Sequence, residues 1–127
     1  MKLRTTHNSI RIRVRKSELV VLQRELRIEE SIRFPSNILF KFTVTVNNTE
    51  ENLQASLEDH NLVLSIPHQK AVQWINSNQV GIETTLQVSD NEQLHLLIEK
   101  DFPCIDRENE DKSDTFWELV PDQSKAC

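Results

Sequence analysis

The sequence is notably poor in glycine and cysteine. Its 127 residues include a single glycine, Gly81. Phosphate-binding loops and dinucleotide fingerprints need several glycines so that the backbone can approach the phosphate, which excludes both motifs. The two cysteines, Cys104 and Cys127, form no metal or redox motif and are too few for a disulfide framework. We therefore expect free thiols, a reducing compartment and a buried, structural Cys104.

Long apolar runs and an excess of basic charge are also lacking. No stretch approaches the roughly 20 apolar residues of a membrane span, and the polar start of the chain does not suit a signal peptide. The net charge of −5 argues against a general nucleic-acid binder, which needs a basic surface. The four histidines are far apart, without metal-ligand spacing. We expect a cytoplasmic protein that binds no membrane, nucleic acid or cofactor.

The clearest pattern in the chain is the alternation of apolar and basic residues from Ile10 to Arg15. Successive side chains of a strand point to opposite faces, so this pattern predicts a strand with one apolar and one basic face. The basic face carries Arg11, Arg13 and Arg15. Extended along the chain, the same interpretation makes the even-numbered positions from Ile10 to Ile98 the apolar lining of a sheet.

Alternation and turn residues predict the remaining elements. Strands are expected at 27–34, 38–46, 53–57, 62–66, 80–88 and 94–100, with a short first strand at 2–5. One short helix should begin near Ser17, its expected N-cap, and another at Pro67. Gly81 predicts a bulge or a close backbone approach.

These elements indicate an α+β fold that is mainly β. Because the connections are too short for most parallel crossovers, we expect a curved antiparallel sheet, or a partly closed barrel, of six or seven strands with two short helices. No internal repeat is visible. The expected organisation is one domain over residues 1–105, followed by a charged, mobile tail over 106–127. The tail's apolar residues (Phe116, Trp117, Leu119 and Val120) could dock on the core or on a partner.

The basic strand is the main pointer to a site, because arginines at alternate positions repel one another unless carboxylates or a ligand lie opposite. A solvated face with cross-strand ion pairs is one interpretation. The other is a concave site for an anionic small molecule, formed by Arg11, Arg13, Arg15, Arg33 and Lys41. A third, weaker analogy is with triphosphate tunnel enzymes, whose metal Glu83 and Glu99 would hold. Their Glu-x-Glu-x-Lys signature is absent, and the chain is short for that fold. No catalytic residue is identified.

Four segments resemble the landmarks of an uncharacterised bacterial family of short proteins. They are residues 8–18 (NSIRIRVRKSE), 29–34 (EESIRF), 79–83 (QVGIE) and 99–104 (EKDFPC). The resemblance extends to about Arg107, and similar sequences tend to have glycine where this chain has His7. It implies a bacterial cytoplasmic protein, but the resemblance supplies no activity, ligand or catalytic residues.

Three hypotheses remain open from the sequence. The first is a small non-enzymatic module that binds another protein or assembles as a homodimer, through a sheet edge or the apolar tail. The second is binding of an anionic, phosphorylated small molecule by the basic sheet face. A metal-dependent phosphohydrolase of tunnel type is the third hypothesis.

Overall fold

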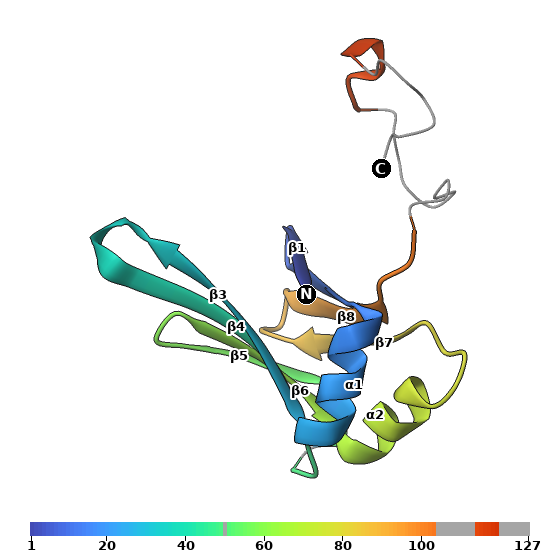
Figure 1. Cartoon of the computed structure of the whole chain (residues 1–127). Helices are drawn as coiled ribbons and strands as arrows, with labels where there is room; N and C mark the ends of the chain where they lie inside the picture. Colours follow the sequence, from blue (N-terminus) through green and yellow to red (C-terminus); the bar gives the residue numbers. More distant parts are fainter. Residues whose placement is uncertain (50, 104–113, 120–127) are drawn as a thin grey trace.

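The computed structural model describes residues 1–49, 51–103 and 114–119. The first half contains β1 (Lys2–Thr6), β2 (Ser9–Val14), α1 (Lys16–Glu25), β3 (Arg27–Phe34), the 3₁₀ turn η1 (Pro35–Asn37) and β4 (Ile38–Asn47). The second half contains β5 (Gln54–Glu58), β6 (Asn61–Pro67), α2 (His68–Ile75), β7 (Gly81–Gln87), β8 (Gln93–Lys100) and the 3₁₀ turn η2 (Trp117–Leu119). Figure 1 shows the arrangement, with α1 and α2 side by side.

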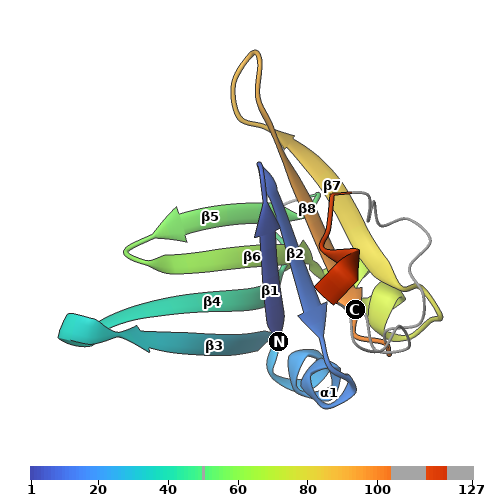
Figure 2. The ribbon, with the colours of Figure 1, turned by 90° about the horizontal axis from the view of Figure 1, so that it is seen from above.

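The strands form two four-stranded sheets. Sheet A has the order β1-β2-β8-β7 and sheet B the order β3-β4-β6-β5. In both sheets the two central strands are parallel and the outer pairs antiparallel. The strands of one sheet run crosswise to those of the other (Figure 2).

The predicted α+β, mainly β class is confirmed, but three details were wrong. The described residues form eight strands rather than six or seven, the sheets are mixed rather than antiparallel, and they do not close into a barrel. The parallel pairs need no crossover connection between them. They arise because two hairpins in each sheet lie side by side and pair through their second strands, β2 with β8 and β4 with β6.

The chain is an internal repeat of two ββαββ units, which the sequence analysis missed. The first unit is β1-β2-α1-β3-β4 and the second is β5-β6-α2-β7-β8, and each contributes one hairpin to each sheet. Backbone hydrogen bonds at equivalent positions of the repeat occur in both sheets. The matched pairs are His95 N to Asn8 O (2.9 Å) with Lys41 N to His60 O (3.0 Å), and Lys100 N to Val80 O (2.9 Å) with Val46 N to Leu26 O (3.0 Å).

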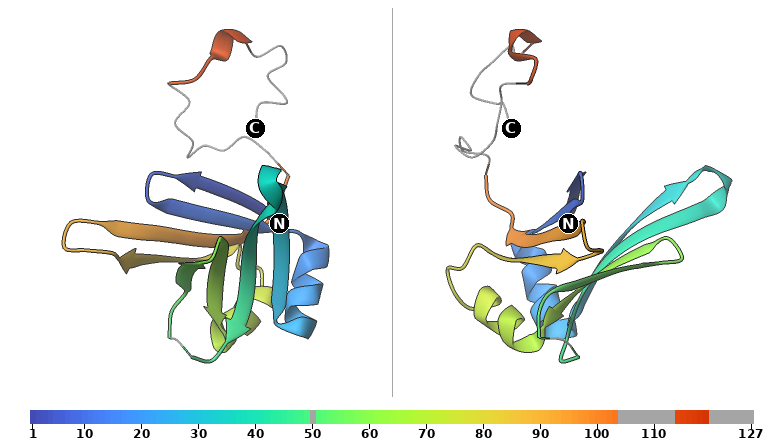
Figure 3. Two further views of the ribbon diagram at one scale, coloured as in Figure 1. Left: turned by 90° about the vertical axis from the view of Figure 1, so that its left-hand side faces the viewer. Right: turned by 180° about the vertical axis from the view of Figure 1, so that it is seen from behind.

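The core lies between the two sheets and the helices, as the views of Figure 3 show. Even-numbered residues face it from β2, β3, β4, β6, β7 and β8, as predicted, but β5 presents the odd-numbered Ala55, as does β1 with Leu3, which precedes the predicted range. The reason is turn length. The two-residue turns 7–8 and 59–60 reverse the parity of the paired strand, so that Leu3 faces Ile12 and Ala55 faces Leu64.

Local chemistry fixes the ends of the helices. Arg15, not Ser17, is the N-cap of α1, and its backbone N–H donates to Glu18 Oε1 at 2.9 Å. In α2, the fully buried Trp74 donates its ring N–H to Val80 O at 3.0 Å and so ties the helix to the start of β7. The predicted close approach at Gly81 is confirmed, because a Cβ there would lie 2.6 Å from Ile98 O.

Candidate anion-binding face

The outer face of sheet A, which points away from the core, concentrates basic side chains. The pairing of β1 with β2 sets Lys2 directly opposite Arg13 and Arg4 directly opposite Arg11. Directly opposed residues of an antiparallel pair point to the same face, where like charges destabilise the sheet. We call this surface the charged face; it also carries Thr6, Ser9, Glu83, His95, Leu97 and Glu99.

One buried carboxylate organises part of the charged face. Glu99 and Arg13 are each only 7% exposed, and Arg13 Nε donates to Glu99 Oε1 at 2.8 Å. Arg11 Nε lies 3.5 Å from the same oxygen. The guanidinium carbon of Arg13 also lies 5.6 Å from the centroid of the Phe102 ring, within the range of a cation–π contact. Arg13 is therefore a structural residue, whereas the side chain of Arg11 is 35% exposed.

Beside this ion pair the charged face is hollowed. The hollow has a volume of about 220 Å³ and is lined by Arg4, Thr6, Ser9, Arg11, His95 and Leu97. Guanidinium and hydroxyl groups are hydrogen-bond donors, so the lining suits an anionic oxygen ligand.

His95 is oriented by its neighbours on β7. Its Nε2 lies 3.2 Å from Glu83 Oε1, and its Nδ1 lies 3.4 Å from Thr85 Oγ1. Ser9 is the direct register partner of His95 on β2, but both ring nitrogens already face groups on β7. In this arrangement the imidazole is not placed to take the proton of the Ser9 hydroxyl, and the pair contributes polar lining rather than a nucleophile and its base.

The five basic residues predicted to form a site lie in three places. Arg11 and Arg13 share the charged face, whereas Arg15 is the N-cap of α1, and its Nε lies 3.4 Å from Glu18 Oε1. Arg33 and Lys41 belong to sheet B, where Arg33 hydrogen-bonds to Asn37. The structure thus brings together two of the five.

Four polar residues that line the hollow were not among the predicted site residues: Arg4, Thr6, Ser9 and His95. A signal was available for Arg4 and Thr6. A two-residue turn at His7-Asn8 sets Thr6 opposite Ser9 and therefore Arg4 opposite Arg11. No local signal places His95 there, because β8 joins β2 from the far end of the chain.

The two candidate metal ligands have other partners. Glu99 is held by Arg13 and Arg11, and the exposed Glu83 lies against His95. Within residues 1–49, 51–103 and 114–119, no three or more His, Cys, Asp or Glu side chains gather in a way that could hold a metal ion. Cys104 lies outside the described residues.

The internal repeat shows that the fold does not require charges at these positions. The position of the Arg13–Glu99 pair in sheet A corresponds in sheet B to Ser65 and Thr45, whose hydroxyls lie 3.4 Å apart. The neighbouring pair Arg11–Leu97 corresponds to Val63–Thr43. The same scaffold thus forms with small neutral side chains, and the ionic arrangement is a property of sheet A alone.

Comparison with known proteins identifies the family. The model of DUF7009, a family of unknown function, matches residues 1–118. The chain belongs to this family. The DUF7009 match includes every strand of both sheets, and hence the whole charged face. No curated protein and no solved structure matches the chain. Among the described residues of this DUF7009 member, no helix has the length and apolar character needed to cross a membrane.

Proposed function

We propose that this DUF7009 protein binds an anionic group, a phosphate or polyphosphate of a small molecule, in the hollow of the charged face. The observation that carries the proposal is the register that sets Arg4 directly opposite Arg11 at a hollow lined by hydroxyl groups. Arginine presents a planar fork of donors that matches phosphate oxygens. An anion in the hollow would accept charge-assisted hydrogen bonds from the guanidinium groups that line it.

The charged face is rich in cations, although the chain as a whole has a negative net charge. Four cations (Lys2, Arg4, Arg11 and Arg13) gather on two strands of a protein whose net charge is −5. Three described carboxylates offset part of this charge: Glu99 beside Arg13 and Arg11, Asp101, whose Oδ2 lies 3.1 Å from Lys2 Nζ, and Glu83 beside His95. Glu99 and Asp101 lie toward the Lys2–Arg13 end of the strand pair, whereas the hollow lies toward the turn at residues 7–8, with Glu83 beside it. The hollow combines the guanidinium groups of Arg4 and Arg11 with the hydroxyl groups of Thr6 and Ser9, and this set of donors suits an anion.

Thermal unfolding with inorganic phosphate, pyrophosphate and ATP tests the proposal. A ligand that binds only the folded state at a hundred times its Kd stabilises it by about 2.7 kcal/mol, so Tm should rise with pyrophosphate. Arg11→Ala should abolish the rise. Arg33→Ala is the matched control on sheet B and should retain it. If no anion raises the Tm of the wild-type protein, or if both variants respond alike, the proposal is wrong.

A second candidate function is assembly into a homodimer, which a different surface favours. Ile32, Phe34, Ile38 and Leu57 are exposed, although they lie on the core-facing side of sheet B. They belong to the ends of the β3–β4 and β5–β6 hairpins that project past the helices (Figure 1). Packing this surface against a second copy would remove these side chains from water. Each would stabilise the dimer by on the order of 1 kcal/mol, since each is already partly buried.

Light scattering as a function of concentration tests the dimer. We expect Ile38→Lys to weaken association, because it would place an ammonium group in the apolar contact. Val88→Lys, at an exposed position beyond β7, should leave association unchanged. A wild-type protein that stays monomeric at millimolar concentration contradicts this second candidate.

A bacterial, cytoplasmic setting is part of the proposal and is supported by the motif resemblance.

A further inference from the structure

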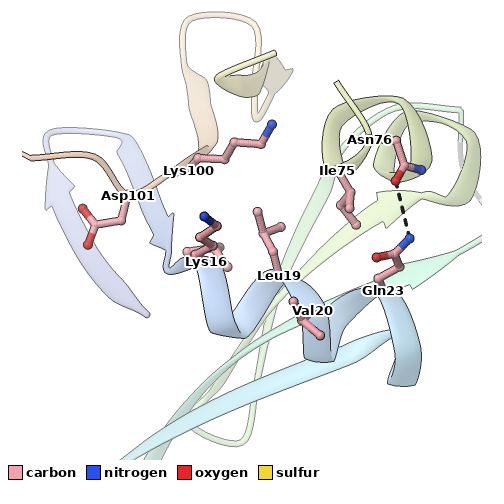
Figure 4. A pocket seen from close by; sticks show the side chains of 9 residues that line it. Lys16, Leu19, Val20, Gln23, Ile75, Asn76, Lys100 and Asp101 are labelled. Atoms are coloured by element: carbon pink, nitrogen blue, oxygen red, sulfur yellow. Dashed lines mark hydrogen bonds between the residues drawn. The ribbon is translucent and has the colours of Figure 1, made fainter. Parts of the chain in front are cut away.

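Two grooves flank the helix pair α1–α2, and the internal repeat relates one to the other. The open groove has a volume of about 430 Å³, and its lining includes Lys16, Leu19, Val20, Ile75, Lys100 and Asp101 (Figure 4). The closed groove, whose lining shares Gln23, Ile75 and Asn76 with that of the open groove, has a volume of about 40 Å³. Its lining includes His68, Ala71 and Val72, which take the places of Lys16, Leu19 and Val20 in the repeat.

The difference in volume follows from the lengths of the helices. Helix α1 has 10 residues and α2 has 8, and α1 continues into the left-handed C-cap Leu26. Leu22 and Leu26 lie along the closed groove and fill it. The shorter α2 ends at Asn76, and Val80, the equivalent of Leu26 in the repeat, is exposed and does not line the open groove, which therefore stays unfilled. The open groove is thus an unfilled copy of a groove that the molecule fills elsewhere.

We propose that residues 114–119 of the same chain dock in the open groove. Phe116 and Leu119 are 72% and 71% exposed, the highest values among the large apolar side chains described. Leu119 N donates to Phe116 O at 3.1 Å, and side chains three residues apart in a 3₁₀ turn lie on one side. The segment therefore presents a ready apolar face, whose two side chains match the apolar floor formed by Leu19, Val20 and Ile75.

Charge and reach both favour this occupant. Lys16 and Lys100 stand at one end of the groove, where Asp101 is already paired with Lys2, whereas the segment carries Asp114 and Glu118. Lys100 uses one donor for Ser77 O at 2.7 Å, which leaves it two further protons to share. Asp101 already lines the groove, and residues 102–113 span up to ~40 Å when extended. The α1 helix is only about 15 Å long, so the segment reaches any point of the groove.

Amide hydrogen exchange on the full-length chain tests the docking, and the repeat supplies a matched control. We expect the amides of residues 114–119 to exchange at least about tenfold more slowly in the wild type than in Val20→Asp, which places a carboxylate in the open groove. Val72→Asp makes the same change at the equivalent position of the closed groove and should retain the protection. Phe116→Ser with Leu119→Ser should in turn speed exchange of the amides near Val20.

Several results would overturn the proposal. One is that the amides of residues 114–119 exchange without protection in the wild type. Another is that Val20→Asp and Val72→Asp lose protection of these amides equally. Protection that rises with protein concentration, together with a dimer mass in light scattering, would show that the segment binds a second copy instead. Circular dichroism checks that Val20→Asp remains folded. If it does not, Lys16→Glu, at an exposed position, tests the charge contribution and should also speed exchange at 114–119.

Discussion

Arg13 and Glu99 face each other across the parallel pair β2–β8, and both are almost completely buried. The Nε to Oε1 distance is 2.8 Å, and Phe102 covers the guanidinium. The pair joins the first and last hairpins of the chain, and thus the two units of the repeat. Its burial also fixes the position of Arg11, which contacts the same carboxylate oxygen from the edge of the hollow.

Replacing Glu99 should be costly. Glu99→Ala would leave the buried Arg13 charge without its partner, and breaking a buried pair in this way costs about 3–5 kcal/mol. We expect a loss of that size in the free energy of unfolding, measured by urea denaturation. Glu83→Ala removes an exposed carboxylate of the same face and should change stability by less than about 0.5 kcal/mol. Equal effects of the two substitutions would contradict the structural role of Glu99.

Stability should fall in acid partly through Glu18. Burial alone would raise the pKa of Glu18, but the amino group of Met1 and hydrogen bonds from Arg15 outweigh burial and hold the pKa below its ordinary value. A carboxyl group whose folded pKa is depressed stabilises the protein above its unfolded pKa, and this contribution is lost as pH falls through the folded pKa.

Glu18→Gln should therefore destabilise the protein at pH 7 and have progressively less effect as the pH falls below 4.5, the ordinary pKa of the group. Urea denaturation at a series of pH values measures this difference. Glu25→Gln, at the exposed end of α1, is the control and should show no such trend. A cost of Glu18→Gln that stays constant from pH 7 to pH 2 would disagree with the assignment.

Gly81→Ala should destabilise the fold by about 1–3 kcal/mol, as overpacking does. The new Cβ would meet Ile98 O at 2.6 Å and Glu99 Cβ at 3.0 Å, and the first contact is with rigid backbone. Thermal unfolding measures the effect. Its repeat equivalent, Arg27, carries a full side chain, so Arg27→Ala should cost much less. An unchanged Tm for Gly81→Ala would mean that β7 and β8 separate more easily than the structure indicates.

How far the sequence predicts this molecule can be judged from particular residues. The alternation from Ile10 to Arg15 correctly placed β2 and its two faces, because side-chain direction in a strand is local. The pairing of β2 with β8 is not local. No pattern near Arg13 indicates that its partner is Glu99, so the sequence could show that the arginines needed acids opposite but not which acids.

The same limit explains the wrong topology. Short connections forbid a direct parallel crossover, which favoured an antiparallel sheet. Two hairpins that pair through their second strands give parallel neighbours without any crossover, and only the register between distant strands reveals this. The repeat was equally hidden, because its two halves share strand pairing rather than residue types; Arg13 and Ser65 occupy equivalent places.

Calorimetric titration of the wild-type protein, Arg4→Ala and Arg11→Ala with pyrophosphate, at two salt concentrations, tests the central claim most directly. We expect saturable binding near one equivalent, weaker binding at higher salt, and at least about a tenfold loss of affinity in each variant, since a charge-assisted hydrogen bond contributes about 1.5–3 kcal/mol. Absence of binding by the wild type, or equal affinity in all three proteins, would contradict the claim that the charged face of sheet A is an anion site.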